Sequence, residues 1–242
     1  MKRLFVFALL SILCLEGAMA QKVRRFGVFD HAAIGVSAGT TGVGFELAAP
    51  ITDFLVLRAG YSFMPELKYS TDVHYKAAGV ENETEIEGKL KYGNGHALLD
   101  IYPIPGCTFH ATVGAFYGTD KLITAENKQP IIGLLPGEGL EIGDYIIGPD
   151  VDGIARAAIK VKKLKPYVGI GFGRAVPRHR VGFGADFGVQ LWGSPKVYEQ
   201  VTGKDVEVTS QDVGNKDGGI IKEISKISIW PVIDLKLTVR LF

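Results

Sequence analysis

Apolar and small residues alternate without interruption along Val181–Trp192, which reads VGFGADFGVQLW. The odd positions from Val181 to Leu191 are apolar, whereas the even positions up to Gln190 are glycine, aspartate or glutamine. Side chains on a β-strand point to opposite faces with a period of two residues. The segment therefore predicts a strand with one apolar face and one face of small and polar residues.

The glycine-rich face decides between two kinds of β-protein. Glycine covers a water-facing surface poorly and weakens a strand. In a barrel, however, such a face fits a crowded interior while the apolar face is turned to lipid. We therefore interpret Val181–Trp192 as a membrane-spanning strand.

The same alternation recurs along most of the chain. It is found in Ala32–Ala38, Val43–Ala49, Phe54–Met64, Thr108–Ala125, Gly153–Lys162, Tyr167–Gly173 and Trp230–Phe242, and more weakly in Lys196–Thr209. Short turns are expected at Pro50–Asp53, Ile104–Cys107, Leu164–Pro166 and Gly193–Pro195, and long polar loops near 65–83, 126–152 and 203–226. The pattern predicts an all-β fold, an antiparallel up-and-down transmembrane β-barrel of about 10 strands, with eight to twelve strands compatible.

One stretch, Glu81–Tyr102, changes phase. Its odd positions are charged from Glu85 to Lys91 but apolar from Ala97 to Ile101. Gly93-Asn94-Gly95 between them suits a hairpin turn or a bulge. Because a hairpin would break the succession of short and long connections, we favour one long strand that leaves the bilayer at this level.

The first 20 residues have the pattern of a secretory signal peptide. Lys2 and Arg3 precede the apolar run Leu4–Leu15, and Ala18-Met19-Ala20 has the small-x-small pattern of a cleavage site. We predict that residues 1–20 are removed and that 21–242 form a single outer-membrane barrel domain with a long external loop at 126–152.

The amino-acid composition limits the kinds of binding partner that we expect for this chain. The chain without residues 1–20 holds 25 basic and 25 acidic residues, which gives no reason to expect a nucleic-acid partner. Its one cysteine, Cys107, excludes an intrachain disulfide. No cofactor and no metal site is predicted. Aromatic residues near predicted strand ends, among them Tyr102, Tyr167, Trp192 and Trp230, favour girdles at the membrane interfaces.

With these features, the chain resembles small Gram-negative outer-membrane β-barrel proteins, many of them uncharacterised. The segments that carry the resemblance are Leu57–Ser62 (LRAGYS), Lys165–Gly173 (KPYVGIGFG) and Gly193–Val197 (GSPKV). The resemblance implies an outer-membrane location, contact with outer-membrane lipid, and recognition of the terminal aromatic Phe242 by the barrel-assembly machinery. Phe242 lies one residue out of the apolar phase of Val239 and Leu241, so it departs from the family pattern.

Charges of both signs fall on the predicted inward faces: Glu46, Arg58, Asp100, Arg156, Lys160, Lys162, Asp186, Asp234, Lys236 and Arg240. Buried charges must pair, so this balance favours a self-neutralising lumen. We expect Asp186 to meet Lys160 or Arg156. A lumen network is predicted from Glu46, Arg58, His96, Asp100, His110, Arg156, Lys160 and Asp186.

His96, Asp100 and His110 are the only candidates for chemistry. A histidine and a carboxylate on one face are also the parts of a base with its orienting group. We expect a structural network and no enzyme. The leading hypothesis is an outer-membrane barrel serving envelope structure, or the passage or binding of a small solute that the sequence does not identify. The alternatives are a barrel enzyme acting on lipid or peptide, and a soluble periplasmic ligand-binding barrel.

Overall fold

The computed structural model describes residues 27–77, 80–104, 106–131, 140–142, 145–150, 152–201, 204–208 and 225–242. The predicted signal peptide lies outside the described residues. Within them, no helix is long and apolar enough to cross a membrane.

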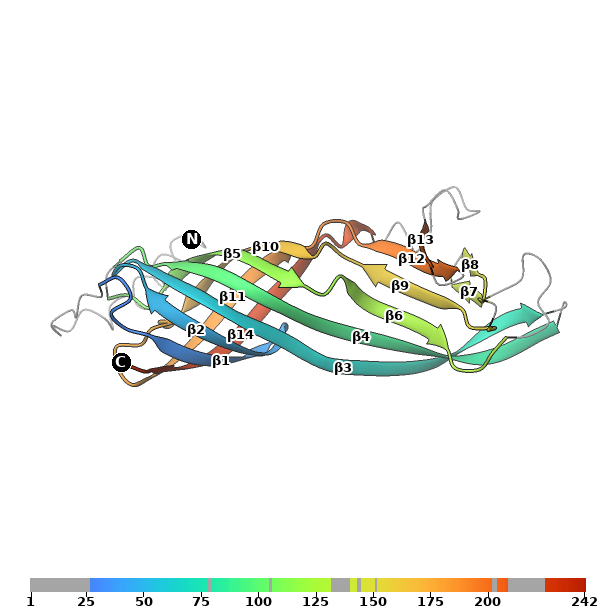
Figure 1. Cartoon of the computed structure of the whole chain (residues 1–242), viewed down its shortest axis with the longest axis horizontal. Coiled ribbons are helices and arrows are strands. Elements are labelled where there is room, and N and C mark those ends of the chain that lie inside the picture. Colours follow the sequence, from blue (N-terminus) through green and yellow to red (C-terminus); the bar gives the residue numbers. More distant parts are fainter. Residues whose placement is uncertain are drawn as a thin grey trace, which may run out of the picture.

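Eight strands close into a ring (Figure 1). They are β1 (Ala33–Gly39), β2 (Gly42–Pro50), β3 (Leu55–Ala77), β4 (Val80–Ile101), β5 (His110–Gly118), β10 (Leu164–Phe172), β11 (Val181–Leu191) and β14 (Ile229–Arg240). Each strand pairs antiparallel with the next in this order, and β14 pairs with β1. The predicted all-β antiparallel barrel is confirmed.

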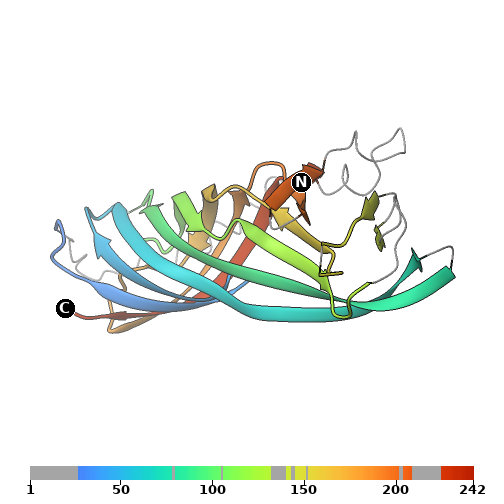
Figure 2. The ribbon, with the colours of Figure 1, turned by 45° about the vertical axis from the view of Figure 1, so that its right-hand side comes forward.

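The other described strands form an extension at one end of the barrel. They are β6 (Lys121–Asn127), β7 (Leu140–Ile142), β8 (Tyr145–Ile147), β9 (Arg156–Lys160), β12 (Lys196–Val201) and β13 (Lys204–Val208). β6 pairs with the outer half of β4 and is followed across the sheet by β9, β12 and β13, while β7 pairs with β3. Figure 2 shows the long β3–β4 pair running from the barrel into this extension.

The number of spanning strands differs from about 10 because two segments counted as spans belong to the extension. Gly153–Lys162 contains β9, and Lys196–Thr209 contains β12 and β13. The first is one strand, as predicted, whereas the second, predicted as one strand, holds two strands that pair with each other, and all three strands pair beyond the ring. Alternation identifies a strand without showing whether its neighbours close a barrel.

The barrel is apolar outside and polar inside. Phe45, Phe183 and Leu235 are among the most exposed apolar side chains, at 58%, 78% and 65%. Arg58 and Asp100, in contrast, are buried inside the ring. A soluble ligand-binding barrel requires the opposite arrangement, so the lipid-facing interpretation stands.

Glycines on the inward face make room for large lumen side chains. A Cβ atom on Gly188 would lie 2.5 Å from the hydroxyl oxygen of Tyr167, and one on Gly171 would lie 2.3 Å from a carboxylate oxygen of Asp186. The alternating glycines of the sequence are therefore a packing requirement of the narrow interior.

β4 is one continuous strand through Gly93-Asn94-Gly95, as predicted. Its even residues stay on the inner side along its length, while the apolar residues change from odd positions in the barrel to even positions, such as Ile86, in the extension. The phase change of the sequence thus marks the exit from the lipid-facing zone.

β3 makes the same change by another device. Apolar residues keep odd positions on both sides of Pro65, but a register shift between Met64 and Leu67 places two residues opposite one on β4. This β-bulge reverses the faces, so Phe63 points to lipid and Val73 packs inside the extension. The polar loop predicted at 65–83 is therefore wrong: residues 65–77 belong to β3 and residues 80–83 to β4, because Pro65 occupies a bulge and does not end the strand.

Two more connections differ from the expectation. Leu164–Pro166 belongs to β10 instead of forming the short turn predicted there. Residues 174–180, which by the alternation of short turns and longer loops are expected among the longer connections, join β10 to β11 at the end of the barrel opposite the extension. The connections at 51–54 and 102–109 lie at that same end. The described parts of 126–152 lie in the extension and include β7 and β8.

Candidate functional site in the barrel lumen

Arg58 on β3 occupies the centre of the lumen, where it is 1% exposed. One guanidinium nitrogen donates to Glu46 at 3.1 Å and to Asp186 at 2.9 Å, and the other donates to Asp100 at 2.9 Å. The three carboxylates come from β2, β11 and β4, so a single cation ties together strands around the ring. Arginine suits this role because its planar fork offers several donors and stays charged.

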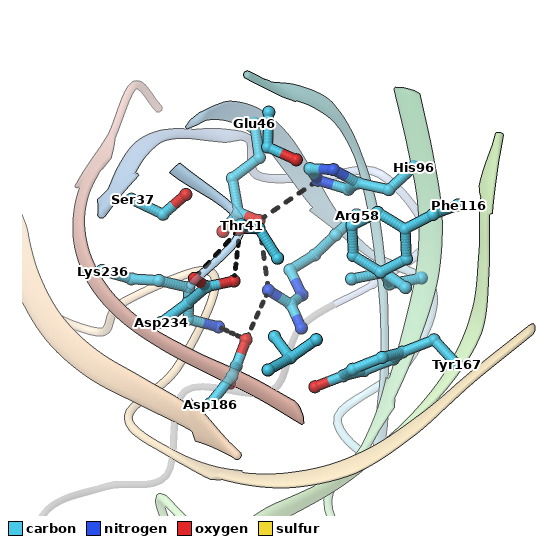
Figure 3. Close-up of a pocket in the computed structure, with 13 residues that line it drawn as sticks. Ser37, Thr41, Glu46, Arg58, His96, Phe116, Tyr167, Asp186, Asp234 and Lys236 are labelled. Carbon is cyan, nitrogen blue, oxygen red and sulfur yellow. Dashed lines mark hydrogen bonds and ion pairs between the residues drawn. The ribbon is translucent and has the colours of Figure 1, made fainter. Parts of the chain in front are cut away.

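Asp186 connects this centre to two further side chains. Its second contact on Oδ2 is Lys236 Nζ of β14, at 2.7 Å. Its Oδ1 lies 3.1 Å from His110 Nε2 of β5. Figure 3 shows Asp186 and Lys236 converging with Arg58 inside the ring. A buried carboxylate is stabilised when its oxygens are occupied in this way.

The remaining members complete the network. The Thr112 hydroxyl donates to Asp100 at 2.8 Å, and the Thr41 hydroxyl donates to Asp234 at 3.0 Å. His96 Nε2 lies 3.8 Å from a carboxylate oxygen of Glu46. The lumen is thus filled by charged groups of both signs in contact with one another.

Little space is left between these side chains. The cavity bordered by Glu46, Arg58, Asp186 and Lys236 offers about 20 Å³ to the centre of a water molecule. A space of this size holds about one water. The charged side chains therefore fill most of the lumen at this level.

Apolar layers close the lumen on both sides of the charged network. At the end opposite the extension, Ala175 and Val176 of the β10–β11 connection are buried against Tyr102. At the junction with the extension, Trp192 and Trp230 stack with ring centroids 4.7 Å apart. Tyr102, Tyr167 and Trp192 are therefore interior residues, which corrects their placement in interfacial girdles.

Six of the eight residues named from the sequence lie inside the ring: Glu46, Arg58, His96, Asp100, His110 and Asp186. Arg156 and Lys160 do not, because β9 lies in the extension. The pairing of Asp186 with either of them is wrong, since its cationic partners are Arg58 and Lys236.

The sequence reasoning missed Lys165, which is fully buried and donates to Asn94 and to the Thr119 carbonyl, both at 2.8 Å. Its signal was present: extending the inward set Tyr167, Gly169 and Gly171 back by two residues reaches Lys165. The turn expected at Leu164–Pro166 concealed it.

The arrangement offers little to catalysis or metal binding. His110 Nε2 lies 3.1 Å from Asp186 Oδ1 and 3.8 Å from Asp100 Oδ2, so Asp186 is its closer carboxylate. His110 and Asp100 are both fully buried, and each contacts other side chains of the lumen network. Within the described part of the chain, no group of three or more His, Cys, Asp or Glu side chains is placed to hold a metal ion.

A closed antiparallel ring with an apolar outside and a charged inside defines a transmembrane β-barrel, and comparison with solved structures agrees. The crystal structure of Acinetobacter baumannii CarO2 superposes with a TM-score of 0.50 and 15% identity, over 90% of this chain and 100% of that one. Acinetobacter baumannii CarO gives 0.49 and 18%, over 86% and 96%. The likeness to CarO2 confirms the resemblance to outer-membrane barrels at the level of the fold. By sequence, neither a protein-family profile nor any curated protein matches.

Proposed function

We propose that the protein is a non-enzymatic, integral outer-membrane β-barrel whose lumen is closed, so that it anchors the β-sheet extension at the cell surface and is not a solute pore. The observation that carries this proposal is the small space of about 20 Å³ around Arg58, bordered by side chains that hold one another in place. The apolar layers above and below add two more barriers.

The outer-membrane location and the orientation rest on two supports. The CarO neighbours are outer-membrane proteins. In such barrels the short turns face the periplasm and the longer segments face outward. On this basis the connections at 51–54, 102–109 and 174–180 are periplasmic, and the extension is extracellular. Phe242, which is 66% exposed just beyond β14, remains a predicted signal for the assembly machinery.

Planar-bilayer recording of the full chain tests the closed lumen. We expect no steady conductance from the wild type, while an open sixteen-stranded porin inserted in the same membrane conducts. Retention of the protein in the bilayer is checked by heat-modifiable migration on gels. A steady, concentration-dependent ionic current through the wild type would instead favour passage of small solutes and refute closure.

A further inference from the structure

A second polar cluster lies on the outer face of the extension, the face that continues the lipid-facing surface of the barrel. On β4 the odd positions are outward at Leu99 and remain outward as far as Lys89. On the neighbouring strand β6, Thr124 is directly opposite Lys89. Thr124 is in turn opposite Ala158 on β9, and Ala158 is opposite Tyr198 on β12. Directly opposed residues of an antiparallel pair share one face. These four side chains therefore form one outward row.

The row borders a hollow, because Ala158 is small and stands beside the larger Tyr198. The hollow offers about 180 Å³ to the centre of a water molecule, against about 20 Å³ in the lumen. Its border includes Lys89, Lys121, Glu126, Arg156, Tyr198 and Asp205. It is the more spacious of the two and opens outward.

Two carboxylates in this hollow are shared among four cations. Asp205 accepts from Lys160 and lies 3.0 Å from Lys121 Nζ. The hydrogen bond from Lys160, then that from Lys121, lowers the pKa of Asp205, so this carboxylate is ionised at neutral pH.

Glu126 is placed in the same way between Lys89 and Arg156, whose Nε lies 3.8 Å from Oε2. Lys89 also lies 3.1 Å from Glu87, and a guanidinium nitrogen of Arg156 lies 4.0 Å from Asp150. Lys121 and Lys160 share Asp205, so these three ionised groups keep one positive charge. The ammonium group of lysine and the guanidinium group of arginine donate charge-assisted hydrogen bonds to phosphate oxygens.

Tyr198 adds an aromatic ring to the hollow, and the Lys160 ammonium lies over a face of this ring. Lys160 Nζ lies 4.2 Å from the centre of its ring. Gln200 lines the same hollow and offers an amide for hydrogen bonding. An aromatic ring flanked by hydrogen-bonding groups is a surface on which the C–H face of a sugar ring stacks. The hollow therefore offers an aromatic ring and an amide to a sugar, and cationic hydrogen-bond donors to a phosphate.

The height of the hollow above the hydrocarbon layer indicates that a phosphate-bearing sugar bound there belongs to a membrane lipid. Tyr117, 63% exposed, ends the lipid-facing set on β5, and Lys121 follows four residues later. Because residues 119 and 120 lie between β5 and β6, four residues of chain span at most roughly 14 Å, or about 10 Å of height at the usual tilt of a barrel strand. This is the layer of headgroups and first sugars, because the polar headgroup zone begins directly above the hydrocarbon.

We propose that this hollow binds the phosphate-bearing sugar headgroup of a glycolipid in the outer leaflet. The proposal rests on the outer-membrane orientation proposed above and is independent of whether the lumen is closed. The occupant approaches sideways from the membrane surface, with its phosphate between Lys121, Lys160 and Arg156 and its sugar against Tyr198.

The test is titration of the full chain, held in phosphatidylcholine nanodiscs, with diphosphoryl lipid A. We expect the double variant Lys121→Gln/Lys160→Gln to lose roughly tenfold in affinity, as removal of two charge-assisted donors implies. The matched control is Lys128→Gln, which removes a cation of the same extension that pairs with Glu85 outside the hollow. This variant keeps wild-type affinity.

Asp205→Asn separates ligand binding from a structural role. If Lys121 and Lys160 serve a phosphate, freeing them from the carboxylate tightens lipid A binding. If they serve only to hold β13 in place, the same variant loosens the extension and weakens binding. Heat-modifiable migration verifies that each variant keeps its barrel.

Two further ligands identify the source. Dephosphorylated lipid A is expected to bind more weakly than the diphosphoryl form, and glucose 1-phosphate is expected to bind more weakly still. Equal affinity for the two forms of lipid A would overturn the role of the phosphate. Equal affinity for glucose 1-phosphate would overturn the lipid and indicate a soluble sugar phosphate. A conducting wild type with intact lipid A binding would refute only the closed lumen.

Discussion

The lumen and the outer face of the extension use the same chemistry in different surroundings. In the lumen, Arg58 is held by three carboxylates and about 20 Å³ remains free. On the extension, Asp205 and Glu126 are each shared by two cations beside a hollow of about 180 Å³. Buried charges that lose a partner are costly, whereas exposed ones exchange partners with water and ligands. We therefore propose that pairing closes the lumen, whereas the exposed pairs of the extension leave their cations available to a ligand.

The largest expected effect comes from Arg58→Ala. Three carboxylates lose their shared cation inside the barrel, which we expect to destabilise the protein by roughly 3–5 kcal/mol. Urea unfolding in lipid vesicles, followed by tryptophan fluorescence, measures the change. Arg156→Ala on the extension is the matched control and is expected to cost less than about 1 kcal/mol. Equal effects of the two variants would contradict the contrast between buried and exposed pairing.

Phe187→Arg tests the lipid-facing surface. Phe187 is exposed near the middle of β11, and an arginine at the bilayer midplane costs roughly 2–4 kcal/mol. We expect a reduced yield of folded, heat-modifiable protein in vesicles. Ser70→Arg, at an exposed site on the outer face of β3 beyond the bulge, is expected to insert normally. Failure of both variants would place lipid against the extension as well.

Gly188→Ala tests the packing of the interior. The new methyl group would lie 2.5 Å from the Tyr167 hydroxyl oxygen, and overpacking of this kind costs typically 1–3 kcal/mol. In Gly95→Ala the nearest atoms would lie 3.8 Å away, so this control is expected to be nearly neutral. The unfolding midpoints of the two variants, compared with wild type, give the measurement.

The smallest effect concerns the pH dependence of the extension. Hydrogen bonds from Lys160 and Lys121 lower the pKa of Asp205 from its ordinary value of 3.8. The stabilisation this provides is complete above that value and is lost as the pH falls through the lowered pKa. Amide exchange in β13 is therefore expected to accelerate below about pH 4 relative to the barrel strands. In Asp205→Asn the difference between pH 7 and pH 3 should disappear.

The barrel could be predicted because lipid on one side and a crowded lumen on the other impose strict alternation. β11 and β14 follow the pattern residue by residue, so Asp186 and Asp234 could be placed inward from sequence. Arg58 and Glu46 were found for the same reason. Alternation is a local signal, however, and it is equally regular in β9, where Arg156 and Lys160 lie on the extension and not in the lumen.

The partners of the lumen charges could not be predicted because they depend on the closure of the ring. Arg58 and Asp186 are 128 residues apart in sequence and meet only when β3 and β11 face each other across the lumen. The hollow of the extension escaped prediction for a similar reason. Lys89, Thr124, Ala158 and Tyr198 come from four strands whose register no single segment encodes.

The bulge between Met64 and Leu67 has a consequence for how deep the molecule sits. Below it β3 presents aromatic residues such as Phe63 to the outside, and above it the same side presents Lys68. The bulge thus sets the level on β3 at which the apolar outer surface ends, and this level limits how deep the barrel inserts into the bilayer. Moving the bulge by two residues along β3 would shift the boundary between the apolar and the polar outer surface by roughly 7 Å along the strand.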